Sequence, residues 1–127
     1  MKPVIALCLL FSLAAVAKAE DPEATFQGFC SEWMQKLEVR EQHNATNIKW
    51  ESSADGVRGA YVGYTQDHTC ILKERKDSGT VGKISYREIR YEKRGGTIAE
   101  AEHSVAHPVE TTEITEIFRY AKGQWVY

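Results

Sequence analysis

The apolar residues of this chain change their spacing once, close to Asn44, and that change most constrains the fold. From Phe26 to Leu37 they recur every three or four residues, as on one face of an amphipathic helix. Asp21 and Pro22 are typical of a helix start, since Asp can cap and Pro fits the first turn. Beyond Asn44 the period becomes about two, which indicates strands. The order predicts an α+β fold, with one N-terminal amphipathic helix packed on a bent antiparallel sheet of five to seven strands.

Turn residues divide the second part of the chain into strands. Strands are expected around Ile48 and Trp50 and over residues 57–65, 69–75, 80–94, 97–104, 109–121 and 124–127. Residues 99–102 are also good helix material, and the His107-Pro108 pair is expected to interrupt the pattern. The alternation slips within the long strand, which predicts a β-bulge near Arg87 and Glu88 that bends the sheet.

The first nineteen residues have the pattern of a secretory signal peptide. A basic start and a short apolar run precede Ala17-Lys18-Ala19, a small-residue cleavage site. Cleavage would leave residues 20–127 as one domain, remove Cys8 and two lysines, and move the net charge from −2 to −4. We therefore expect a secreted or periplasmic protein. In a eukaryotic host, the sequon at Asn44 would fall near the helix end, where a glycan could be tolerated.

Cleavage leaves two cysteines, Cys30 and Cys70, in an oxidising compartment. An even number of cysteines there favours a disulfide, which the chain-entropy account values at roughly 4 kcal/mol for this loop length. The rival interpretation is a reactive or metal-bound thiol, but neither cysteine lies in a Cys-x-x-Cys pair or at zinc-ligand spacing. We expect the bond to pin the helix to the sheet.

The order of elements resembles the cystatin-like superfold, which includes the nuclear-transport-factor-like and ketosteroid-isomerase-like rolls. The segment from Glu116-Ile117-Phe118-Arg119-Tyr120 to Trp125 is similar to the last hairpin of such rolls. The resemblance implies a helix lying in a curved sheet. The chain has no Gln-x-Val-x-Gly hairpin, so protease inhibition of the cystatin kind is not implied.

Motifs for phosphate, dinucleotide or metal-protease chemistry are absent from the sequence, so no cofactor is expected. His103 and His107 lie four apart, but on a strand they would be about 13 Å apart, too far to share one metal ion. A roll can hold an acid–base site in its cavity. The candidate residues are Asp67, His68, Glu88, Arg90 and His103.

Aromatic residues on the strands suit a surface that binds a partner or a small ligand. The candidates are Trp50, Tyr64, Tyr91 and Trp125. The leading hypothesis is a non-catalytic exported binding module for a protein or a small apolar ligand. The alternatives are a cofactor-free cavity enzyme of isomerase or hydrolase type and a secreted inhibitor or effector. The mildly acidic charge gives no reason to expect nucleic acid, or a membrane after signal cleavage, as a partner.

Overall fold

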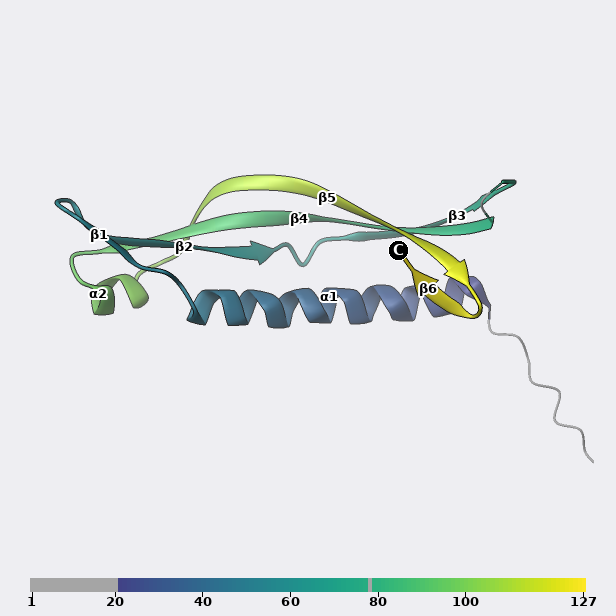
Figure 1. Ribbon diagram of the computed structural model, residues 1–127, viewed down its shortest axis with the longest axis horizontal. Coiled ribbons are helices and arrows are strands. Elements are labelled where there is room, and N and C mark those ends of the chain that lie inside the picture. The colour runs from purple at the N-terminus through teal and green to yellow at the C-terminus, as the bar shows by residue number, and fades with distance from the viewer. Residues whose placement is uncertain (1–20, 78) are drawn as a thin grey trace, which may run out of the picture.

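The computed structural model describes residues 21–77 and 79–127, so the predicted signal peptide lies outside the described residues. The elements are α1 (Pro22–Thr46), β1 (Glu51–Ser53), β2 (Gly56–Tyr64), β3 (Thr69–Arg75), β4 (Gly79–Gly95), α2 (Ile98–Glu102), β5 (His107–Ala121) and β6 (Gln124–Val126). They form the predicted α+β fold, with the long helix lying along one face of a curled antiparallel sheet (Figure 1). The six described strands fall within the expected number.

β4 is the central strand of the sheet, and it pairs with three other strands. β2 and β3 lie end to end along one of its edges, against residues 88–95 and 79–85, and β5 pairs along the other edge. β1 extends the sheet beyond β2, and β6 pairs with the end of β5. The two outer hairpins follow their turn signals, since Gly56 and the Lys122-Gly123 pair have the positive φ angles that such turns need.

The helix begins where the sequence predicts. Asp21 accepts a hydrogen bond from the Glu23 backbone N–H, and Pro22 is the first helical residue. The expected stop at His43 and Asn44 was slightly early, because α1 continues to Thr46. Gly28 lies on an exposed part of α1 with open space beside it, so it neither allows close packing nor marks the helix start.

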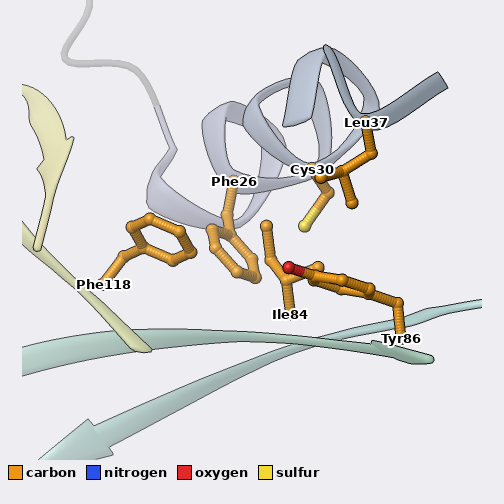
Figure 2. Packing of buried hydrophobic residues seen from close by; sticks show 6 residues of the cluster. All are labelled: Phe26, Cys30, Leu37, Ile84, Tyr86 and Phe118. Atoms are coloured by element: carbon orange, nitrogen blue, oxygen red, sulfur yellow. The ribbon is translucent and has the colours of Figure 1, made fainter. Parts of the chain in front are cut away.

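The core lies between α1 and the β3–β4–β5 end of the sheet (Figure 2). Its buried side chains are Phe26, Cys30, Leu37, Ile84, Tyr86 and Phe118. The Phe26 ring occupies the space that a side chain at Gly82 would need. A glycine in the middle of β4 thus permits the aromatic ring of α1 to reach the sheet backbone.

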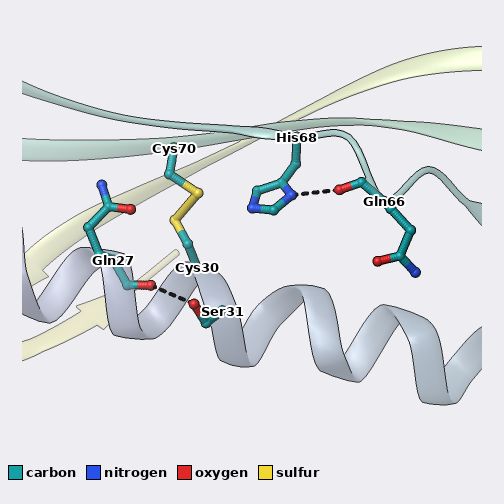
Figure 3. The surroundings of a disulfide bond; sticks show 6 residues. All are labelled: Gln27, Cys30, Ser31, Gln66, His68 and Cys70. Carbon is teal, nitrogen blue, oxygen red and sulfur yellow. Dashed lines mark hydrogen bonds between the residues drawn. A yellow bond between two sulfur atoms is a disulfide. The ribbon is translucent and has the colours of Figure 1, made fainter.

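The predicted disulfide joins Cys30 of α1 to Cys70 of β3 (Figure 3). The two Cα atoms are 6.4 Å apart, and Cys30 is buried in the core. The bond fixes the position of the helix relative to the sheet edge, as expected from the sequence.

β4 changes the parity of the residues that it turns toward the helices. Gly82 and Tyr86 face α1, whereas farther along, Tyr91 lies beside Gly63 and Gly95 lies against α2. The slip in alternation is therefore real. It lies between Tyr86 and Tyr91, around the expected position. The predicted bulge was misplaced, because the register with β5 shifts between Arg90 and Tyr91 and the extra residue, Val109, belongs to β5 and not to β4.

Three element predictions were wrong. Residues 97–104 contain the helix α2 and not a fifth strand, because Thr97 caps the backbone N–H of Glu100 and starts a helical turn. The pair at 107–108 does not separate two elements, since β5 begins at His107, although Pro108 lies beside the register shift with β4. A strand was expected around Ile48 and Trp50, but both residues precede β1 and pack over Gly59.

Candidate functional site

The predicted acid–base residues Asp67 and His68 lie in the loop between β2 and β3. Both are exposed, and the His68 Nδ1 atom lies 2.8 Å from the Gln66 carbonyl oxygen. They line an open surface groove with Arg87 and Glu113. An open, hydrated groove does not supply the water-excluded setting in which a single His or carboxylate is tuned for proton transfer.

The other acid–base candidates lie elsewhere. Glu88 is a half-buried β4 residue that pairs with Tyr64 in register and does not line that groove. Arg90 is exposed on β4. His103 caps the end of α2, with Nδ1 2.7 Å from the Ala99 carbonyl oxygen. The structure therefore does not bring these candidates together into one enclosed site.

Metal-ligating groups also remain dispersed. His103 ends α2 and His107 begins β5. Among residues 21–77 and 79–127, no three His, Cys, Asp or Glu side chains are grouped so that they could hold a metal ion. In the same residues no charged or amide side chain is buried, and the polar group that lies in the core is the Tyr86 hydroxyl.

The four aromatic candidates are half-buried packing residues, so the prediction that they form an exposed set was wrong. Trp50 lies over Gly59. Tyr91 stacks on Tyr61 with ring centroids 5.2 Å apart. The rings of Tyr64 and Trp125 pack on core residues Tyr86 and Phe26, at centroid distances of 6.0 and 4.7 Å respectively. They pack because the helix side of the sheet is where large apolar rings are removed from water.

Exposed apolar groups lie instead on the side of the sheet turned away from α1. Cys70 and Leu72 of β3 point toward the helix, so their neighbours Ile71 and Lys73 point to the opposite face. Ile71 lies beside Lys83 in the register, and Lys83 lies beside Ile117. Ile71 is 48% exposed and Ile117 is 52% exposed.

Positive charge lies within this row, at Lys83, and in the row on one side of it. In the next row, Lys73 and Arg119 flank Val81, which is only 5% exposed. We call this surface the outer face, which comprises Ile71, Lys73, Val81, Lys83, Ile117 and Arg119. It combines solvent-exposed aliphatic groups with three cations and no carboxylate. The alternation of residues 69–73 shows in the sequence that Ile71 and Lys73 share one face of a strand. The row that they form with residues of β4 and β5 becomes visible only from the pairing of the three strands.

A second polar cluster lies on the helix side of the sheet. The Tyr86 hydroxyl donates a hydrogen bond of 3.1 Å to Glu116 Oε1. Burial, and then the negative charge of Glu116, raise the pKa of Tyr86 well above its usual range. The buried Trp33 indole N–H lies next to the Tyr86 hydroxyl and slightly opposes this rise in pKa, although it makes no hydrogen bond of ordinary geometry in the described structure. Trp33, Tyr86 and Glu116 come from α1, β4 and β5, so this cluster holds the helix against the sheet and is not assigned a functional role.

The sequon residue Asn44 does not stand free at the helix end. Its Nδ2 atom donates a 3.0 Å hydrogen bond to the Val62 carbonyl oxygen of β2, and the side chain is half-buried. A glycan on this nitrogen would compete with the contact between α1 and β2. The contact uses one of the two Nδ2 hydrogens, and the expectation that a glycan could be tolerated here stays a prediction.

No family profile matches this chain, and comparisons with curated proteins and with solved structures find no relative. Within the described residues, each helix is too short or too polar to cross a bilayer. The outer face is thus the candidate functional site, on the basis of the chain's own residues.

Proposed function

We propose that this chain is an exported, non-catalytic binding module that binds a protein partner through its outer face. The observation that carries this proposal is the row of Ile71, Lys83 and Ile117, which crosses three strands and exposes two isoleucines to solvent. Exposed aliphatic groups that are rimmed by charge are typical of interaction surfaces. The signal-like N-terminus and the Cys30–Cys70 disulfide support export.

Binding is favoured over catalysis by the positions of the titratable groups. Asp67, His68 and His103 are exposed, and the helix side of the sheet is filled by packed apolar side chains. A cavity enzyme would need at least one such group in an enclosed pocket with a perturbed environment. A protein partner does not require an enclosed pocket, so the open outer face is sufficient for binding.

The chemistry of the outer face defines the partner. Lys83 lies between Ile71 and Ile117, so it favours a carboxylate at the centre of the partner surface, and the isoleucines favour aliphatic groups on either side of it. Lys73 and Arg119 in the next row favour further carboxylates. A lipid surface fits less well, because membrane-binding faces use the large aromatic and leucine side chains that this face lacks. We therefore assign a protein whose surface combines carboxylates with flanking aliphatic groups as the partner.

The test is affinity capture from the compartment into which the host exports the protein. The wild-type chain is compared with Ile71→Ser/Ile117→Ser, with Lys83→Glu, and with the matched control Val39→Ser. Val39 is 64% exposed on α1, away from the outer face. Circular dichroism establishes that each variant is folded.

We expect one captured protein whose binding falls at least about tenfold in both outer-face variants and weakens with added salt, while Val39→Ser retains it. Equal capture by all four proteins, or loss only with Val39→Ser, would contradict the proposal.

A further inference from the structure

We propose that the free edge of β5 is a second binding site, which takes an extended, lysine- or arginine-rich peptide as an added strand. Among residues 21–77 and 79–127, β5 is paired with β4 from His107 to Arg119, and β6 covers its opposite edge only from Arg119 to Ala121. Figure 1 shows β5 running well beyond β6 with this edge uncovered. This site goes beyond the proposed function of the outer face and does not depend on it.

The last hairpin determines which backbone groups point outward from this edge. Ala121 and Gln124 flank the two-residue turn and are paired, so the N–H and C=O groups of Ala121 point toward β6. Backbone groups of alternate residues in a strand point to the same side. The outward groups of the uncovered edge therefore belong to Thr111, Glu113, Thr115 and Ile117.

The uncovered edge is regular over this segment. Pro108 and the extra residue Val109 disrupt the ladder near the start of β5, which is a common means of blocking an edge. From Thr111 to Ile117 the register with β4 has no shift. The outward residues of this segment are exposed, so a ligand strand could reach their backbone groups.

The charge of the edge selects the occupant. Residues 107–118 contain Glu110, Glu113 and Glu116 and no lysine or arginine, and on β4 Arg90 lies opposite Glu110 and Arg87 opposite Glu113. A second copy of β5 would bring two sets of these glutamates together, which disfavours self-association. Glu110 and Glu116 lie on the same side of β5 as the core residues Ile114 and Phe118, away from the cations of the outer face. A peptide with lysine or arginine at alternate positions would instead place its cations beside these two glutamates, and its backbone would pair with that of β5.

The probe is a synthetic, end-capped peptide of about nine residues in which lysine alternates with valine, long enough to span the segment. The control peptide has the same side chains but N-methyl groups on alternate backbone amides, which prevent strand pairing. Binding is measured by NMR on the full mature chain, together with amide hydrogen exchange.

We expect the unmodified peptide to slow exchange at the Thr111, Glu113, Thr115 and Ile117 amides by at least about tenfold, and the N-methylated peptide to bind at least about tenfold more weakly. Equal affinity for the two peptides, or unchanged exchange at these amides, would overturn the proposal. Neither result bears on the outer face, since the probe carries no acidic group.

A backbone variant provides a second test. Thr115→Pro removes one outward N–H and leaves the ladder with β4 intact, because proline is tolerated on the free side of an edge strand. Thr115→Ala is the matched control. We expect Thr115→Pro to lose at least about tenfold in peptide affinity and Thr115→Ala to retain it. Peptide binding by a folded Thr115→Pro at wild-type strength would refute strand addition, and the exchange measurement stands if this variant does not fold.

Discussion

Removal of the Cys30–Cys70 bond should destabilise the domain by about 5 kcal/mol. The bond joins residues 40 apart in the sequence, and closing a loop of that length restricts the unfolded chain by roughly 4 kcal/mol at 25 °C. Cys30 is also buried against the core, so removing its sulfur atom by substitution with alanine adds about 1 kcal/mol of lost packing. The variant is Cys30→Ala/Cys70→Ala, which avoids a free thiol.

The assay is urea unfolding followed by far-ultraviolet circular dichroism at 10 °C, where a weakened domain can still be measured. The predicted loss is a large part of the about 5–15 kcal/mol that stabilises a typical domain. Wild-type protein in reductant is the control, since it lacks the bond but keeps both sulfur atoms, and it should lose about 4 kcal/mol. A loss below about 1 kcal/mol in the double variant, with an unchanged urea slope, would show that packing alone fixes α1 on the sheet and would refute this reasoning.

Two further predictions concern the contact of α1 with β4 and the tyrosine within it. Gly82→Ala should lower the free energy of urea unfolding by about 1–3 kcal/mol, because the Phe26 ring occupies the position of the new methyl group. Gly28→Ala should raise it by up to about 1 kcal/mol, because that site is open and helical. The reverse order of the two stabilities would contradict the packing described. Burial and the charge of Glu116 raise the pKa of folded Tyr86, so its contribution to stability is complete below about pH 10 and declines as the pH rises above it. Unfolding measured at pH 9 and pH 11 should show this decline in the wild type and a smaller one in Tyr86→Phe, and equal declines would exclude Tyr86 as the cause.

The features that the sequence predicted well are those set by local chemistry. The helix begins at its Asp21 cap, and β3 has the predicted bounds because turn residues lie on both sides of it. The disulfide follows from two cysteines in an expected oxidising compartment. In each case a few neighbouring residues determine the outcome, without information on distant contacts.

The features that the sequence missed depend on which elements meet in space. The period-two pattern identified the strands but could not say which face α1 would cover, so half-buried Tyr64 and Trp125 were taken as exposed. The same limit concealed the outer face, because Ile71 and Ile117 are 46 residues apart and meet only across β4. The helix α2 was open to prediction, since Thr97 and Glu100 form a cap that competes with the strand pattern.

Site-specific photocrosslinking tests the central claim that the outer face binds a protein partner. A photoreactive side chain is placed at Ile71 on the outer face and, in a separate variant, at Val39 on α1, both of which are exposed. The crosslinked products are recovered from the compartment of export and identified by mass spectrometry. We predict that the probe at Ile71 forms a covalent adduct with one protein, through an acidic surface of it, and that the probe at Val39 does not. Adducts that form from Val39 and not from Ile71 would contradict the account.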